Sequence, residues 1–512
     1  MTSSIIRGKY VITRALGRHT AQIIENGAIL QRGGRIEEIS DFVALAAKYP
    51  NLPVIGTGNH VVMPGFVNGH HHVGLTPVQL GSPDMPLELW FATRMVTREV
   101  DPYLDTLYSA FEMIASGVTT VQHIHGWVPG DLPKIEHAAN EVIRGYEAIG
   151  MRVSYCYALR DQNHLVYGPN DAFTASVPDD IKPALQRHFG RFQLGAADLV
   201  QLFEQLRKTH HGKSRVRLQL APANLHWCSD AALELLAETS ARHDVPMHMH
   251  LLETPYQKEY AKRRGGGTAV DYLAKFGLLN SRLTLGHGVW LSEGDIECLA
   301  GNGVHVCHNC SSNFRLRSGI APLNRLEEKG VNVAIGIDEA GINDDRDMLQ
   351  EMRMVLRAHR TPGMGDDVPG MGQVLRMATA GGALTTPYGS EIGTLTPGMA
   401  ADLVMINWSQ ISFPYLDEET PVLDAVLQRA KTQGVNTVMV EGEILYQDGK
   451  FTRIDQSAML HELAGRLRRP LNAEELERRN LAHLILPHVR AFYKDYFNPA
   501  DHVPHYRQSS RF

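Results

Sequence analysis

The amino-acid sequence predicts an α/β protein: a decorated (β/α)8 TIM barrel with a small β-sandwich-like domain built from both chain ends. Short β-branched runs alternate with helical patterns from residue 61 to about 385, a pattern typical of parallel strands joined by helices. Glycine-punctuated, β-rich segments flank that region on both sides. The chain has 512 residues, 43% hydrophobic and 21% charged, which is enough apolar matter for a large core and too little charge for a disordered chain.

Eight runs carry the strand pattern of the barrel. They are Val61–Val67, Val118–Ile124, Arg152–Tyr157, Val216–Leu220, Val245–His250, Leu283–His287, Val304–His308 and Val331–Ile337. Most are followed by loop residues and then by a helical pattern, as in Ser229–His243, where Ser229 is a candidate N-cap. Eight strand–helix units match a closed barrel. An open doubly wound sheet is the rival layout, but no G-x-G-x-x-G loop follows the first run.

We expect three parts along the chain. Residues 61–388 form the barrel, and residues 1–60 and 389–454 together form the small β domain. Either β-rich half alone would leave sheet edges and apolar faces exposed, so the two halves are expected to pair. Residues 455–512 read as a C-terminal helical arm that packs on the barrel or on a neighbouring subunit.

The composition excludes several classes of partner. Fifty Lys and Arg residues against 56 Asp and Glu residues give a net charge of −6, so we expect neither nucleic-acid nor membrane binding. Five cysteines, an odd number in a large chain, argue against a disulfide framework. With neither a signal-peptide pattern nor a long apolar run, the sequence predicts a cytoplasmic protein. The outlier is histidine, with 25 residues.

Polar side chains stand at the carboxyl ends of several predicted strands, where a barrel keeps its reacting groups. His70 and His72 end the first run, and strand alternation puts them on the same side. Alternation also puts His248 and His250 on one side of the fifth run, so spacing alone does not choose between them. With Asp338 after the eighth run, these residues offer nitrogen and oxygen donors for one divalent ion. Zinc is the first expectation, and ligand type also allows Fe²⁺ or Mn²⁺.

The order of these motifs resembles the amidohydrolase superfamily, in particular its mononuclear branch of deaminases and chlorohydrolases. That branch includes cytosine, guanine and S-adenosylhomocysteine deaminases and the triazine hydrolases. The resemblance covers roughly residues 5–450. The matching stretches are Pro64–His72, Gly117–Thr120, His250–Glu253, Gly286–His287, Ser312–Asn313, Ser318–Pro322, Gly336–Asp338 and Gly393–Val404.

The resemblance implies a role for each site residue. His70, His72, His250 and Asp338 are implied to bind one catalytic metal ion, which selects His250 over His248 through its His-x-x-Glu relation to Glu253. Glu253 and His287 are implied to do acid and base work, and Asp338 to accept the proton of the attacking water. Binuclear members carry a bridging lysine on the fourth strand, and the fourth run here has none. A mononuclear site is therefore expected.

The expected activity is that of an amidohydrolase acting on carbon–nitrogen bonds other than peptide bonds. A divalent ion lowers the pKa of bound water toward about 7, and Glu253 would protonate a ring nitrogen as hydroxide adds to the adjacent carbon. The leading reading is hydrolytic deamination of an aminated N-heterocycle: a purine, pyrimidine, pterin or triazine. Hydrolysis of an exocyclic C–Cl, C–N, urea or amide bond is the alternative. A third hypothesis, from a different functional class, is a noncatalytic barrel that is used for binding.

The substrate pocket is less clearly marked. Trp90, His226, Asn309 and Asn313 are candidate pocket residues, because they lie near predicted strand ends or in the loop motif of the seventh strand. We expect a small-molecule substrate and a homo-oligomer. The pair Cys307 and Cys310 is half of a structural zinc motif, but the sequence has no second cysteine pair, so buried thiols are expected there.

Overall fold

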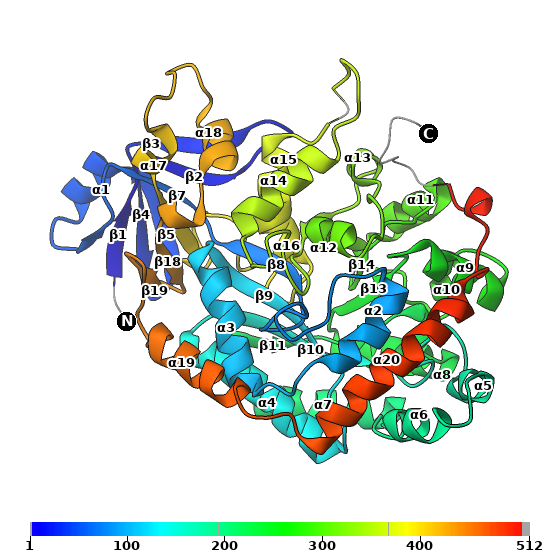
Figure 1. Ribbon diagram of the computed structural model, residues 1–512. Helices are drawn as coiled ribbons and strands as arrows, with labels where there is room; N and C mark the ends of the chain where they lie inside the picture. The colour runs from blue at the N-terminus through cyan, green and yellow to red at the C-terminus, as the bar shows by residue number, and fades with distance from the viewer. Residues whose placement is uncertain (1–2, 193, 367, 504–512) are drawn as a thin grey trace.

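The computed structural model of the chain describes residues 3–192, 194–366 and 368–503, which form a mixed α/β fold (Figure 1). At its centre lies a set of parallel strands connected by helices, which we call the parallel ring. Its strands are β8 (Phe66–His71), β9 (Val118–His125), β10 (Arg152–Leu159), β11 (Val216–Leu218), β12 (Ala221–Pro222), β13 (Met247–Leu251), β14 (Leu283–His287), β15 (His305–His308) and β16 (Val333–Ile335). All pair in parallel with their neighbours.

Short bridges connect the two halves of the parallel ring. One half runs β8–β9–β10–β11, with β12 on β10, and the other runs β13–β14–β15–β16. Parallel bridges Leu220↔Met247 and Asn224↔His250 join the halves on one side, and the parallel bridge His71↔Asp338 joins them on the other. The carboxyl ends of the strands therefore meet around one opening, where parallel α/β folds bind their ligands.

Helices follow the ring strands and cover them. They are α2 (Leu87–Thr93), α3 (Pro102–Ala115), α4 (Leu132–Ile149), α5 (Asn170–Ser176), α6 (Lys182–Phe189), α7 (Ala196–Thr209), α8 (Asp230–His243), α9 (Pro255–Gly265), α10 (Ala269–Ala274), α11 (Glu293–Asn302), α12 (Cys310–Arg315), α13 (Leu323–Glu328), α14 (Met348–Ala358), α15 (Met371–Arg376) and α16 (Gly382–Leu384). The helix predicted after Ser229 is α8, and the Ser229 side chain accepts a hydrogen bond from the Ala232 N–H, as an N-cap does.

Both chain ends contribute to one outer sheet. Its order is β20–β19–β18–β17–β7–β2–β3, and β17 pairs antiparallel with β7. These strands are β2 (Tyr10–Ala15), β3 (Ala21–Glu25), β7 (His60–Pro64), β17 (Leu403–Asn407), β18 (Val435–Val440), β19 (Glu443–Gln447) and β20 (Lys450–Phe451). Helices α17 (Trp408–Ser412) and α18 (Val422–Arg429) connect β17 to β18.

A second outer sheet packs on the first. Its order is β5–β4–β1–β6, formed by β1 (Ser3–Arg7), β4 (Gly27–Arg32), β5 (Arg35–Asp41) and β6 (Val54–Ile55), with α1 (Phe42–Lys48) after β5. One apolar cluster joins Ile6 and Ile29 of this sheet to Val62 and Met405 of the other. The two sheets therefore share a core.

The first predicted run divides into two strands. Val61–Met63 lie in β7 of the outer sheet, and the parallel ring begins only at Phe66 in β8. The predicted boundary between residues 60 and 61 therefore falls inside β7. The change of sheet occurs at Gly65, where a Cβ atom would lie 2.3 Å from the Thr119 side chain. Only glycine allows the backbone to approach Thr119 so closely.

The C-terminal arm lies on its own chain. Its helices are α19 (Gln456–Leu467) and α20 (Ala473–Tyr493); α19 packs on α3, and α20 packs on α2 and α6 (Figure 1). Arg479 Nε donates a hydrogen bond to the Val96 carbonyl at 2.9 Å. Residues 504–512 of the predicted arm lie outside the described residues. Among the described residues, no helix is both long enough and apolar enough to span a membrane.

Replacing Gly65 by alanine should lower the free energy of unfolding by about 1–3 kcal/mol, because the added methyl group overpacks the junction against Thr119. Denaturant unfolding measures this change. The matched control is Gly294→Ala in α11, where a Cβ atom would meet nothing within 4 Å. That control should be neutral or slightly stabilising. Equal stability of the two variants would contradict the packing argument.

Candidate active site

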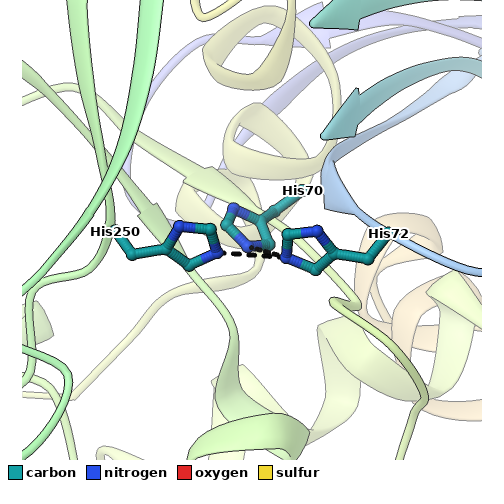
Figure 2. Close-up of side chains that lie close together, drawn as sticks. All are labelled: His70, His72 and His250. Carbon is teal, nitrogen blue, oxygen red and sulfur yellow. Dashed lines mark hydrogen bonds between the residues drawn. The ribbon is translucent and has the colours of Figure 1, made fainter. Parts of the chain in front are cut away.

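Three histidine side chains converge at the opening of the parallel ring (Figure 2). The Nε2 atom of His72 lies 3.0 Å from Nε2 of His70 and 3.0 Å from Nε2 of His250. Asp338 adds a carboxylate, with Oδ1 3.2 Å from His72 Nε2 and 3.7 Å from His70 Nε2. The four side chains that were predicted as metal ligands are thus brought together from β8, β13 and the segment after β16.

The other ring nitrogens of these histidines are held from behind. Nδ1 of His72 donates to the Ile124 carbonyl at 2.7 Å, and Nδ1 of His250 donates to the Ala223 carbonyl at 2.8 Å. A carbonyl can only accept, so each Nδ1 carries the proton and each Nε2 keeps a free lone pair. This is the outer-shell arrangement that orients imidazoles for a metal ion.

His248 lies behind the three-histidine cluster. Its Nε2 atom is 2.8 Å from Nδ1 of His70, on the side of that ring opposite to His72. The histidines that gather as a possible metal site are His70, His72 and His250. The side chains at the end of β13 therefore take different positions, and His248 supports His70 from outside the cluster.

The charge state of the cluster fits a divalent ion. Burial lowers the pKa values of His70 and His250 well below the usual range, so both rings are neutral. Burial would also lower the pKa of His72, but its hydrogen bond to Asp338 outweighs burial and raises it. Burial would raise the pKa of Asp338, but its hydrogen bond to His72 and the nearby imidazoles outweigh burial and lower it, so the group is ionised. Neutral imidazole nitrogens and one carboxylate are the donor set that zinc and similar ions accept.

Local backbone conformation aims two of the site residues. Asp338 has φ 65° and His287 has φ 73°, in the left-handed region that non-glycine residues rarely occupy. Asp338 is held there by its own N–H, which donates to the His70 carbonyl at 2.8 Å, and by His71 Nδ1, which donates to the Asp338 carbonyl at 3.1 Å. Such strain clusters at functional sites, where the surrounding contacts hold it in place.

Glu253 and His287 adjoin the cluster, as predicted for acid–base groups. His287 Nε2 lies 3.6 Å from Glu253 Oε2 and 3.8 Å from Asp338 Oδ2, so this imidazole stands between the two carboxyl groups. Burial raises the pKa of Glu253 well above its usual range, and the Asp338 charge adds to the effect. The pKa values of the two carboxyl groups are therefore shifted in opposite directions.

A buried network supports Glu253. The Glu253 N–H donates to Gln257 Oε1 at 2.9 Å, and the next residue, Thr254, donates its hydroxyl proton to Glu88. Tyr167 donates to the same Glu88 oxygen at 3.0 Å. Burial raises the pKa of Glu88 to about 7. These contacts fix the end of β13 that carries Glu253.

The site opens into a cavity of about 500 Å³. Its wall includes His72, His250, Glu253, His287 and Asp338, together with the indole rings of Trp90, Trp127 and Trp227. An apolar, aromatic wall with a few converging polar groups is the usual form of a small-molecule site. The predicted pocket residue Trp90 is part of this wall.

Three of the candidate pocket residues lie off the cavity wall. Among the described residues, the cavity wall does not include His226, Asn309 or Asn313. The His226 ring is buried against Tyr167, with ring centroids 4.0 Å apart, and its neighbour Trp227 takes the place on the wall. Asn313 Oδ1 accepts a hydrogen bond from His287 Nδ1 at 2.9 Å, and Asn309 also contacts the His287 ring. The two asparagines brace His287.

Sequence reasoning missed the arginines of the cavity wall, which are Arg94, Arg98, Arg160, Arg191, Arg315 and Arg478. Arg94 forms an ion pair with Glu339. Arg160 is 8% exposed, stacks on Trp127 with Cζ 3.2 Å from the ring centroid, and has an Nη1 atom without a hydrogen-bond partner among the described residues. Burial lowers the pKa of Arg160 to about 9. Its position directly after the third predicted strand was the signal that could have identified it.

Comparisons with known proteins show the family of this chain. The model of the amidohydrolase family matches residues 61–445. A 5′-deoxyadenosine deaminase of Methanosarcina barkeri is 30% identical over 471 residues, which cover 90% of this chain and 97% of that protein. A 5-methylthioadenosine/S-adenosylhomocysteine deaminase of Thermodesulfovibrio yellowstonii is 27% identical, covering 89% and 96%.

A solved structure shares the fold. An adenosine deaminase from Xanthomonas campestris with bound zinc superposes with a TM-score of 0.77 at 22% identity, covering 91% of this chain and 99% of that one.

Replacing both His70 and His72 by alanine should remove one divalent ion per chain and abolish turnover, because the two remaining donors make a poor site. Elemental analysis of the purified protein measures the ion, and circular dichroism verifies the fold. The matched control is the pair His211→Ala and His483→Ala, two exposed histidines off the cavity wall, which should retain the ion. An unchanged metal content in the first variant would show that these residues are not ligands.

Proposed function

The chain belongs to the amidohydrolase family, and from this premise we propose that it hydrolytically deaminates an aminated N-heterocycle of the adenosine type. The observation that carries the proposal is the buried Glu253 carboxyl, 3.6 Å from His287 and on the wall of the same cavity as the histidine cluster. A protonated carboxyl group is what addition of water to a ring carbon requires, because the neighbouring ring nitrogen must gain a proton. The relatives described above, named for adenosine derivatives, support the same reaction.

We also propose the finer architecture. The ring strands and their helices constitute a (β/α)8 barrel, supported by the bridges between its two halves. The two outer sheets constitute one small β domain, supported by the shared apolar cluster of Ile6, Val62 and Met405.

One zinc-type ion held by His70, His72, His250 and Asp338 is part of the proposal, supported by the donor set and its spacing. Such an ion supplies a nucleophile at neutral pH by lowering the pKa of water. The wall of this site also carries Glu253 and His287, so a substrate ring there would contact both acid–base groups.

The side chains divide the proton transfers among themselves. Asp338 is ionised and accepts the proton of the attacking water. Glu253 is protonated and delivers its proton to the ring nitrogen. His287, held by Asn313 through Nδ1, turns Nε2 toward both carboxyl groups and orients the attacking oxygen. The amino group then takes the proton that Asp338 accepted and leaves as ammonia, while the new hydroxyl group returns a proton to Glu253.

Arg160 narrows the substrate class. A buried guanidinium is costly when it is not paired, and Nη1 of Arg160 has no hydrogen-bond partner among the described residues. A negatively charged substituent of the substrate would compensate this charge. S-adenosylhomocysteine carries a carboxylate on its 5′ substituent, whereas 5′-deoxyadenosine does not. We therefore propose an adenosine derivative with an acidic 5′ substituent as the preferred substrate.

Replacing Glu253 by glutamine should lower kcat for deamination by roughly 10²-fold or more, because glutamine keeps the size of the side chain but carries no transferable proton. Metal content should persist. In the unsubstituted protein, kcat should fall as pH rises through the raised pKa of Glu253, because the acid loses its proton there. This high-pH decline should disappear in the variant.

The control for Glu253 is Glu259→Gln, a carboxylate in α9 that pairs with Arg263 at 2.7 Å. It should keep both kcat and its pH profile. Near-normal ammonia release by the Glu253 variant, or loss of its metal ion, would overturn the assigned role and would favour hydrolysis without a ring-nitrogen proton donor.

Replacing Arg160 by methionine should raise KM for S-adenosylhomocysteine by about 10–100-fold, the usual effect of losing a hydrogen bond to a charged group. KM for 5′-deoxyadenosine should change little. Ammonia release from the two substrates gives both values. Equal effects on the two substrates would refute a charge-specific contact while leaving the deaminase proposal intact.

A further inference from the structure

A second group of metal-binding side chains lies outside the cavity. It consists of His308, the last residue of β15; Cys310, the first residue of α12; and His359, which caps the C-terminus of α14. Each is buried, at 1% exposure, and none is on the wall of the active-site cavity. Helices α12 and α14 pack against each other there (Figure 1). We call these three residues the His–Cys–His cluster.

The donor atoms of this cluster face one another. Nε2 of His308 lies 2.8 Å from Nε2 of His359, and one donor atom from each of the three residues lies within 4.8 Å of the other two. The spacing resembles that of the proposed catalytic ligands, whose Nε2 atoms are 3.0 Å apart. Two histidine nitrogens and a cysteine sulfur thus converge at a second point of the structure.

The surroundings keep these donors in a form that an ion can use. Burial lowers the pKa values of His308 and His359, so both imidazoles are neutral and have lone pairs. Nδ1 of His308 has no hydrogen-bond partner among the described residues, and Nε2 of the same ring faces His359. Burial raises the pKa of the Cys310 thiol well above its usual range. An ion that binds sulfur would be needed to stabilise the thiolate.

We propose that His308, Cys310 and His359 form a second, structural metal site that binds a thiophilic ion such as zinc. Two imidazoles and one thiolate suit zinc or copper(I), whereas magnesium and calcium prefer oxygen ligands. Binding forms one sulfur–metal and two nitrogen–metal bonds and releases the Cys310 proton to solvent. The ion would tie β15, α12 and α14 together, and α12 carries the Asn313 that holds His287.

The simpler reading is a hydrogen-bonded pair of neutral histidines packed on a thiol. Cobalt(II) substitution separates the two readings, because a thiolate bound to cobalt gives an intense charge-transfer absorption in the near ultraviolet. The catalytic donor set has nitrogen and oxygen but no sulfur, so it gives no such absorption. The signal therefore reports on the His–Cys–His cluster alone.

The experiment compares four full-length proteins: the unsubstituted chain, Cys310→Ser, the double variant His70→Ala with His72→Ala, and the matched control Cys307→Ser. Cys307 is a buried thiol as well, but it lies in β15, three residues before Cys310. Elemental analysis should give about two ions per chain for the unsubstituted protein and the control, and about one for each of the other two. Zinc or copper is identified by the same analysis.

The cobalt-substituted proteins give the second readout. The charge-transfer absorption should be present in the unsubstituted protein, the control and the histidine double variant, and absent in Cys310→Ser. If Cys310→Ser does not fold, His359→Gln tests the same site from the end of α14. One ion per chain and no charge-transfer absorption in the unsubstituted protein would overturn the proposal, as would an absorption that survives in both cluster variants.

Discussion

The contact between the end of β8 and Asp338 is the interaction on which the site depends. The Asp338 N–H donates to the His70 carbonyl, and the parallel bridge His71↔Asp338 joins the first and last strands of the parallel ring. Ligands about 270 residues apart in sequence thus become neighbours. The same backbone hydrogen bonds hold Asp338 at a positive φ. The contacts that close the ring therefore also direct the Asp338 carboxylate toward the histidines. Any change that opens this contact separates the carboxylate from the histidines.

Burial then gives chemically similar groups different tasks. Asp338 and Glu253 are both carboxyl groups on one cavity wall, yet hydrogen bonds and imidazoles lower the pKa of Asp338 while burial raises the pKa of Glu253. In a medium of low dielectric constant, two carboxylates this close could not both ionise without a large cost. The polar contacts of each group decide which one keeps the proton. An acid and a base can therefore coexist within the reach of His287.

The sequence predicted the parts of the site that lie on regular strands. Alternation along a strand placed His70 and His72 together, because the period of two survives in the folded protein. It could not place His226, whose short helical turn rotates the ring toward Tyr167 and leaves the cavity wall to Trp227. Arg160 was not predicted from the sequence. What marks it is an Nη1 atom without a hydrogen-bond partner among the described residues, and only the three-dimensional packing reveals this.

The sequence alone also could not predict where the parallel ring begins or which distant residues come together in the His–Cys–His cluster. The run beginning at Val61 looks continuous, and only the approach of Thr119 to Gly65 shows why it must change sheet. The pair Cys307 and Cys310 had no second cysteine pair in the sequence, so a zinc site was not expected there. The histidines that face Cys310 come from β15 and from the end of α14. A pair separated by about 50 residues has no local pattern to reveal it.

The C-terminal arm completes the wall of the active site. Arg478 of α20 lies on the cavity wall, and Tyr493 accepts a hydrogen bond from the Tyr167 N–H at 3.0 Å. Tyr167 in turn donates to Glu88, which supports the end of β13 next to Glu253. A continuous chain of hydrogen bonds therefore runs from the arm to the residue that follows Glu253. The arm adds surface to the cavity and, through the same contacts, fixes the strand end that positions Glu253.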